Sequence, residues 1–147
     1  MEEIRLTIAG KPTPLSRAGH GQFGGKFLTA PTSRQIGLVV DAWERAGEPR
    51  FEDDTPLLLE VDFIFERPGS HFGTGRNAGI LKASARPFPT GRPDTSNLVK
   101  LVEDALNGNA YKDDSRIVRI HALKRYGERS KTEIVLTPAL PFSGGAA

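Results

Sequence analysis

Four segments of the chain alternate apolar and polar residues, and a period of two predicts β-strands that are buried on one face. The clearest is Leu57–Glu66, in which apolar side chains alternate with Glu60 and Asp62. The other three segments are Ile4–Ile8, Ile117–Tyr126 and Glu133–Thr137. The last two are predicted to be antiparallel strands that pair across the short connection 127–131.

Two further segments repeat their apolar residues at the spacing of an α-helix. Thr32 and Gln35 form a capping-box pattern that opens the first helix, and Gly47 is a natural stop. The second helix is expected over Ser96–Leu106, where an Asn-Gly pair ends the pattern. The apolar faces consist of Ile36, Val39, Val40 and Trp43 in the first helix and of Leu98, Leu101, Val102 and Ala105 in the second.

The order of these elements, β-α-β-α-β-β, predicts the fold class. It indicates a single small α+β domain over residues 1–140, with a mixed β-sheet and two helices packed on it. Residues 141–147 are expected to be a flexible C-terminal tail. A Gly- and Pro-rich loop is expected over Gly10–Lys26. The segment Pro68–Pro93 shows no periodicity, and a connection of that length inside a small domain is usually functional or disordered.

Composition narrows the class of protein. Hydrophobic residues make up 37% and charged residues 26% of the chain, which is typical of a soluble globular protein. The chain contains no Cys, which excludes disulfides, zinc–cysteine sites and thiol catalysis and fits a reducing cytoplasm. No apolar run reaches the ~20 residues of a membrane span, and the acidic start of the chain does not resemble a secretory signal. We therefore expect a cytoplasmic protein without a membrane partner.

Basic and acidic residues are segregated along the chain, although the net charge is only +2. Residues 67–93 contain five basic residues and no acidic one, and residues 116–131 contain six basic residues and one Glu. The acidic residues between these stretches are Asp94, Glu103, Asp104, Asp113 and Asp114. A negative centre framed by basic segments suits a metal-dependent enzyme that acts on a polyanion, whereas ordinary solvated surface charge would give the same pattern. On the first interpretation, the residues expected to bind DNA are Arg76, Lys82, Arg86, Arg92, Lys124 and Arg125.

Polar groups line one side of the second predicted helix. Asn97, Lys100 and Asp104 share a face of this helix. Asp94 precedes it, where free backbone N–H groups favour an anion. An ordinary N-cap at Asp94 and a Lys100–Asp104 ion pair would give the same pattern on any helix, so both interpretations stay open.

A second acidic pair, Asp113-Asp114, lies in a turn before the strand that begins at Ile117. Adjacent carboxylates repel each other unless a cation lies nearby, and Mg²⁺ prefers carboxylate and water oxygens. A bound Mg²⁺ can generate hydroxide from water, and Lys100 can stabilise the negative charge that develops on a phosphodiester. The sequence therefore favours phosphoryl chemistry at a metal ion held by carboxylates.

The residues of Gly73–Ala78 match the glycine fingerprint of dinucleotide-binding proteins, but the surrounding sequence does not. The fingerprint requires a helix directly after it, and the proline-containing segment Ser84–Pro89 cannot form that helix. We therefore expect no nucleotide cofactor.

Three motifs around these residues resemble the signature of the RusA family of Holliday-junction resolvases. They are Pro93-Asp94-x-x-Asn97-Leu98-x-Lys100, Asp104-Ala105-Leu106-Asn107-Gly108 and Asp113-Asp114-Ser115-Arg116-Ile117. The resemblance implies a RusA-like fold and a homodimer that binds four-way DNA junctions and makes paired symmetric nicks in DNA recombination and repair. It also implies one Mg²⁺ site per subunit, with Mn²⁺ as a substitute, and it suits a phage or prophage origin.

Carried over position by position, the resemblance implies roles for the polar residues. Asp94, Lys100 and Asp114 are expected to be catalytic. The expected metal ligands are Asp94, Asp114 and Asp113, and the supporting residues are Ser96, Asn97 and Asp104. Ser96 departs from the family pattern, which usually has an Asp there, and a hydroxyl is a weaker metal ligand than a carboxylate. Two alternatives therefore stay open: a junction-binding protein with weakened or lost cleavage, and a nuclease that acts on other branched DNA.

Overall fold

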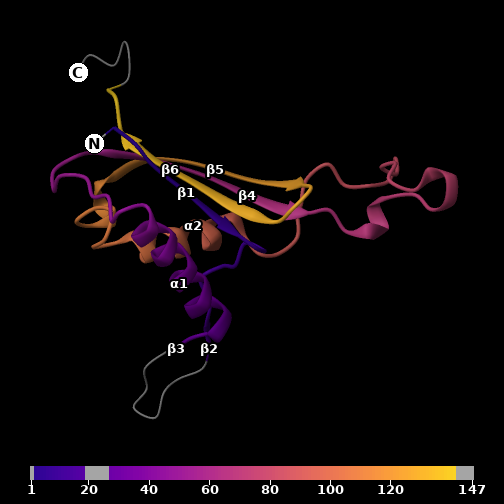
Figure 1. The fold of residues 1–147 in the computed structure, drawn as a ribbon, viewed down its shortest axis with the longest axis horizontal. Coiled ribbons are helices and arrows are strands. Elements are labelled where there is room, and N and C mark those ends of the chain that lie inside the picture. Colours follow the sequence, from indigo (N-terminus) through magenta and orange to yellow (C-terminus); the bar gives the residue numbers. More distant parts are fainter. Residues whose placement is uncertain (1, 19–26, 142–147) are drawn as a thin grey trace.

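The sheet of this protein is mixed, as the sequence predicts (Figure 1). The computed structural model describes residues 2–18 and 27–141. Within them the main sheet has the strand order β1-β6-β4-β5, in which β4 and β5 run parallel and the other neighbours run antiparallel. The bounds are Ile4–Ala9 for β1, Leu57–Glu66 for β4, Ile117–Gly127 for β5 and Lys131–Pro138 for β6.

Strands β5 and β6 run in opposite directions, but they are not neighbours. Strand β4 lies between them and forms hydrogen bonds with both, so the expected pairing of β5 with β6 is wrong. The physical reason is the composition of β4, which is the most apolar strand and is best buried in the middle of the sheet. The connection passes the end of β4, where the Glu66 N–H donates to Ser130 Oγ at 2.9 Å.

Both helices pack on the same face of the sheet and cover the hydrophobic core (Figure 1). They are α1, Ala30–Arg45, and α2, Thr95–Leu106. All the apolar residues predicted to face the core from α2 are buried, and those of α1 are buried or partly buried against the core. In residues 2–18 and 27–141, no helix combines the length and the apolarity needed to cross a membrane.

Helix α1 begins at Ala30, which is earlier than the capping-box pattern predicts. Thr29 is the N-cap, and its hydroxyl accepts from the Thr32 N–H at 3.4 Å. Pro31 fits in the first turn, where the helix needs no N–H donor. Thr32 is buried and ties the helix to the preceding segment, because its hydroxyl donates to the Pro14 carbonyl at 2.8 Å.

The expected loop Gly10–Lys26 contains a short strand that no periodicity could predict. Strand β2, Arg17–Ala18, pairs antiparallel with β3, Phe27–Leu28. Residues 19–26 of that loop lie outside the described residues, as do residues 142–147 of the expected tail.

Residues 68–93 form an arm that extends past the end of the sheet (Figure 1). Its regular structure is limited to two 3₁₀ turns and isolated bridges, one of which joins Phe72 to Leu81. The turns are η1, Gly69–His71, and η2, Gly75–Asn77. The absence of periodicity in this segment therefore corresponds to an extended projection rather than to a buried element.

The base of the arm is anchored to the sheet by Arg67. The guanidinium lies 4.4 Å from the centroid of the Tyr126 ring on β5, and it donates to the Arg86 carbonyl at 2.8 Å. His71 packs edge-on against the same ring at 5.3 Å between centroids. One guanidinium thus joins the outgoing and returning parts of the arm to the end of β5.

Candidate functional site

Helix α2 begins at the polar residues that the sequence singles out. Asp94 is the N-cap by position, yet its carboxylate makes no capping hydrogen bond. Among the described residues it also has no ion-pair partner, and it is exposed together with Ser96 and Asn97 of the first turn. The carboxylate of Asp94 is therefore accessible to a ligand, and the ordinary capping interpretation of this residue is not supported.

The segment that leads into α2 is held from the sheet by Lys124. Its ammonium donates to the Gly91 carbonyl at 2.7 Å and to the Pro93 carbonyl at 2.9 Å. Arg125 points to the other face of β5, where it pairs with Asp62 at 2.9 Å. Contact of Lys124 or Arg125 with DNA stays a prediction, and for Lys124 it would compete with these two hydrogen bonds.

Other carboxylates gather at the far end of α2. The N–H of Asp114 donates at 3.0 Å to Oδ1 of Asn107, which is the C-cap of the helix. Asp113 accepts from the Ser115 N–H at 2.8 Å, at the start of the 3₁₀ turn η3, Asp114–Arg116. Hydrogen bonds from Ser115 lower the pKa of Asp113. The pair Asp113-Asp114 is thus fixed against the C-terminal end of α2.

The carboxylates at this end of α2 contribute to raised pKa values in two neighbouring side chains, Glu103 and Tyr111. Burial raises the pKa of Glu103, and the charges of Asp114 and Asp104 add to the rise while Lys100 opposes it. Burial also raises the pKa of Tyr111, whose hydroxyl donates to the Glu103 carbonyl at 2.8 Å, and the surrounding carboxylates act in the same direction. The C-terminal end of α2 is therefore a region of negative potential.

Asp94 and Asp114 lie at opposite ends of α2. The 12 residues of the helix span about 18 Å at ~1.5 Å per residue. Strand β5 gives an independent measure of this separation. Ile117, at the start of β5, follows the turn that contains Asp114, and Lys124, seven residues later, contacts the segment before Asp94. Seven strand residues span about 23 Å. A single chain therefore does not bring Asp94 and Asp114 together at one ion. Among the described residues, no group of three or more acidic or histidine side chains is arranged to hold a metal.

Lys100 lies between the two ends and is exposed. The ion pair with Asp104 that an ordinary helix surface would offer does not form within 4.0 Å, in the part of the chain that the structure describes. Asn97, Lys100 and Asp104 lie on the exposed side of α2, as predicted from their spacing. The ammonium of Lys100 is thus accessible to a phosphate.

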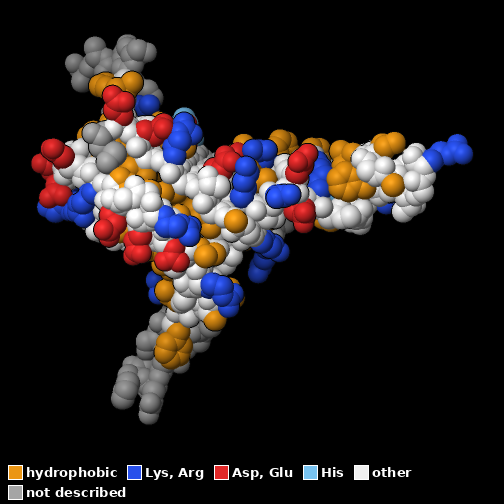
Figure 2. All heavy atoms as spheres, in the orientation of Figure 1, with side chains coloured by type: hydrophobic (Ala, Val, Ile, Leu, Met, Phe, Trp, Pro, Cys, Tyr) orange, Lys and Arg blue, Asp and Glu red, His pale blue; other side chains and the backbone are white. Residues whose placement is uncertain are grey.

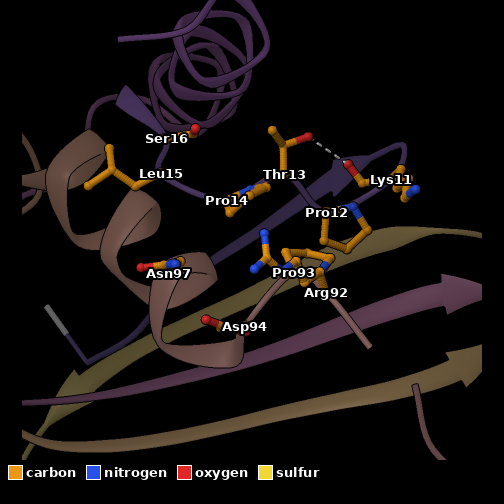
Figure 3. Close-up of a pocket in the computed structure, with 10 residues that line it drawn as sticks. All are labelled: Lys11, Pro12, Thr13, Pro14, Leu15, Ser16, Arg92, Pro93, Asp94 and Asn97. Atoms are coloured by element: carbon orange, nitrogen blue, oxygen red, sulfur yellow. Dashed lines mark hydrogen bonds between the residues drawn. The ribbon is translucent and has the colours of Figure 1, made fainter. Parts of the chain in front are cut away.

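A pocket of about 600 Å³ opens beside Asp94 (Figure 3). One wall is the turn Lys11–Ser16, which follows β1, and the other is the segment from Arg92 to Asn97, which enters α2. The side chain of Arg92 reaches across the pocket toward Pro14 (Figure 3). The pocket therefore joins a basic group to the exposed carboxylate of Asp94.

The basic residues predicted to bind DNA are spread along the arm. Arg76, Lys82, Arg86 and Arg92 are all exposed. Figure 2 shows a basic side chain at the tip of the arm and many of the acidic side chains at the opposite end of the molecule. The arm thus carries predicted DNA-binding residues away from the body of the protein.

Comparison with known proteins identifies the family. Residues 9–137 match the family described as Endodeoxyribonuclease RusA. The chain belongs to the RusA family. Among its relatives, the Uncharacterized protein YqaN of Bacillus subtilis is 46% identical over 92% of this chain and 96% of its own length. The Crossover junction endodeoxyribonuclease rusA of Lactococcus phage r1t is 26% identical over the same shares of the two chains.

A third match is partial. It reaches 35% identity with a penicillin-insensitive murein endopeptidase of Haemophilus influenzae, but it covers 56% of this chain and 30% of that protein. A fragment of that size carries no argument about function. The RusA match, by contrast, includes both ends of α2, the arm and the pocket beside Asp94.

Two residues of this RusA chain gain importance from the structure alone. Glu103 belongs to the acidic group found in the sequence, where it was given no role of its own, and its pKa is raised by burial and then by Asp114 and Asp104. Lys11 lines the pocket beside Asp94 but lies more than 80 positions earlier in the chain, and no local pattern links the two. Only the tertiary contact between the turn after β1 and the start of α2 could reveal it.

Proposed function

We propose that this RusA-family protein is a Mg²⁺-dependent endonuclease that resolves four-way DNA junctions as a homodimer. The observation that supports the proposal best is the accessible set of carboxylates, Asp94 at one end of α2 and Asp113-Asp114 at the other, in a chain with this family membership. The name of the phage relative, which states a crossover-junction substrate, supports the choice of DNA. That relative also supports a phage or prophage origin.

The separation of the carboxylates makes the dimer part of the proposal. Asp94 and Asp114 lie at opposite ends of α2, whose 12 residues span about 18 Å, so we infer that one ion that contacts both requires two chains. We therefore propose that Asp94 of one subunit and the partner's Asp114 hold the same ion, with the partner's Asp113 beside it. A two-fold dimer with antiparallel α2 helices would contain two such sites, one for each strand to be nicked.

The residues fit a hard divalent cation. Asp94 offers a carboxylate without protein partners, and the acidic C-terminal end of α2 is a place where the helix dipole disfavours further negative charge. Burial raises the pKa of Glu103, and repulsion from Asp114 and Asp104 adds to the rise; a cation would relieve that repulsion. A bound Mg²⁺ would lower the pKa of a water and neutralise charge on the scissile phosphate. Lys100, exposed on the same side of α2, would bind a non-bridging oxygen of that phosphate as its charge increases.

The basic arm would position the DNA. Arg76, Lys82, Arg86 and Arg92 are exposed and can contact phosphates without losing a strong protein partner. Lys124 and Arg125 remain weaker candidates, because each is already engaged with the protein.

The test is nicking of a synthetic four-way junction, labelled on each strand in turn, with and without Mg²⁺. The wild type is expected to nick two opposed strands only when the metal is present. Asp94→Asn and Asp114→Asn should each lower the nicking rate by about 100-fold or more while junction binding is retained. Asp41→Asn, which removes an exposed carboxylate from α1, is the matched control and should nick normally. Wild-type rates in both ligand variants would refute the assignment of the ligands.

Ser96 supports a second candidate, a junction-binding protein with weakened or lost cleavage. Its exposed hydroxyl stands two residues after Asp94, where the family usually has a carboxylate. A wild type that binds junctions but does not nick them, together with a Ser96→Asp variant that does, would favour this candidate. Competition among a junction, a fork and a linear duplex at fixed salt separates both candidates from a nuclease that acts on other branched DNA.

A further inference from the structure

We propose that the pocket beside Asp94 is a nucleotide subsite, in which Lys11 and Arg92 bind the backbone phosphate next to the one that is cleaved (Figure 3). This inference rests on the proposed nuclease function and specifies where the cleaved strand lies. It adds to the DNA contacts above a residue, Lys11, that lies outside the basic stretches of the sequence.

The size and lining of the pocket suit a nucleotide. Its volume of about 600 Å³ is within the usual range for small-molecule sites. Three prolines, Pro12, Pro14 and Pro93, line it and present apolar surface that can contact a sugar or a base. Asp94 lies at its edge, so a strand that occupies the pocket would continue directly to the proposed metal ligand.

The turn that forms one wall is fixed before any ligand binds. The Leu15 N–H donates to the Asn97 carbonyl of α2 at 3.0 Å. The Ser16 N–H donates to Thr32 Oγ1 at 3.0 Å, and the Thr32 hydroxyl donates to the Pro14 carbonyl at 2.8 Å. Both helices therefore hold this wall, and a site that is already shaped loses less entropy on binding.

The charges in the pocket favour a phosphate. Lys11 and Arg92 are exposed, and within residues 2–18 and 27–141 neither side chain has a hydrogen-bond or ion-pair partner. Arg67 and Lys124, by contrast, donate to protein carbonyls nearby. A phosphate bound between the two walls would lie between two cations without protein partners in the described part of the chain, and the prolines would give a nucleotide apolar contacts that an inorganic ion does not make.

The first experiment measures the salt dependence of junction binding in Ca²⁺, chosen to allow binding without cleavage. Lys11→Gln and Arg92→Gln should each lower the slope of log K against log salt by about 1, and the double variant by about 2. The control is Arg45→Gln, which removes an exposed cation at the far end of α1 and should leave the slope unchanged. An unchanged slope in the Lys11→Gln variant would overturn the subsite.

The second experiment locates the phosphate. Junctions that carry one neutral methylphosphonate at a time are bound to the wild type and to the Lys11→Gln/Arg92→Gln variant. At one position the replacement should weaken wild-type binding by about tenfold and leave the double variant nearly unaffected. That position should be the phosphate adjacent to the nick. Losses of equal size in both proteins at every position would show that these residues bind no particular phosphate, and would refute the proposal.

The two proposals fail in different ways. A protein that shows the coupled phosphate but never nicks DNA retains the subsite and loses the nuclease function. A protein that nicks junctions with no coupled phosphate retains the function and loses the subsite. A wild type that binds neither a junction nor a linear duplex would refute both.

Discussion

At the scale of single residues, Lys124 shows how a basic side chain can serve a site without contacting the substrate. Its ammonium donates to the Gly91 and Pro93 carbonyls, just before Asp94. Lys124 itself lies on β5, an edge strand of the sheet. Hydrogen bonds from a charged donor are worth about 1.5–3 kcal/mol when buried and less here, since the contacts are partly exposed. We interpret Lys124 as a residue that positions Asp94.

Lys124→Met should therefore raise the Mg²⁺ concentration needed for half-maximal nicking without changing the salt slope of DNA binding. Lys124→Arg keeps the positive charge and a donor, and it should restore part of the metal affinity. A salt slope that falls by about 1 in the Met variant would instead place Lys124 on a DNA phosphate.

Glu103 permits a prediction about pH in the absence of divalent metal. Its pKa is raised in the folded protein, chiefly by burial and then by Asp114 and Asp104, so its charged form is disfavoured in the folded state. Above the ordinary Glu pKa of about 4.3 this group opposes folding, and the penalty disappears as the pH falls below that value. Glu103→Gln should thus raise the free energy of unfolding at neutral pH and have no such effect below pH ~4. Urea titrations across this pH range measure the difference, and equal stabilities at neutral pH would contradict it.

The residues that the sequence identified share a local signal. Asp94, Asn97 and Lys100 stand at helical spacing, and their exposure on α2 follows from that spacing. Lys11 and Lys124 have no such signal, because their neighbours in space come from other strands and turns. A single sequence shows local periodicity but not tertiary contacts, so these two roles could only come from the structure.

At the scale of elements, β4 was predictable and its neighbours were not. The expected bounds of Leu57–Glu66 agree with the structure, because a long alternating pattern fixes both the strand and its buried face. The pairing of strands depends on tertiary packing, which a local pattern of apolar residues does not show. Nothing in the sequence between β5 and β6 indicates that β4 lies between them.

The end of β5 depends on a glycine that is close to β4. A Cβ built on Gly127 would lie 2.5 Å from Cγ2 of Ile64, a buried side chain with little freedom to move. Gly127→Ala should therefore lower the free energy of unfolding by about 1–3 kcal/mol through overpacking. Gly69→Ala is the control, since nothing lies within 4 Å of its built Cβ and its φ is not positive. Equal urea midpoints for the two variants would contradict the expectation.

At the scale of the whole molecule, the proposed shared sites predict complementation between inactive variants. Asp94→Asn and Asp114→Asn homodimers each lack a ligand in both sites. In a mixed dimer, one site combines both substitutions, while the other combines the intact Asp94 of one chain with the intact Asp114 of its partner. Mixing the two variants should therefore restore nicking of one strand per junction, measured after subunit exchange. If each chain held its own ion, every site in the mixed dimer would still lack a ligand, and no activity would return.

The fold class and the family were accessible from the sequence, whereas the placement of the proposed metal ligands was not. Element order gave the mixed sheet with two helices, and the motifs around α2 gave the RusA family. The three motifs follow one another closely in the sequence, which suggests one compact site. The helix itself separates them, because residues close in the sequence of a helix are spread along its axis.

Helix α2 has a further consequence in the proposed dimer. Each copy of the helix begins in one metal site and ends in the other, so a continuous hydrogen-bonded rod connects the two cutting centres. Their separation is then fixed at about 18 Å by the length of a single element rather than by the elasticity of an interface. A helix lengthened by one turn would shift the two incisions relative to each other by a defined amount, about 5.4 Å of protein. The spacing of the two incisions would thus be a direct record of helix length.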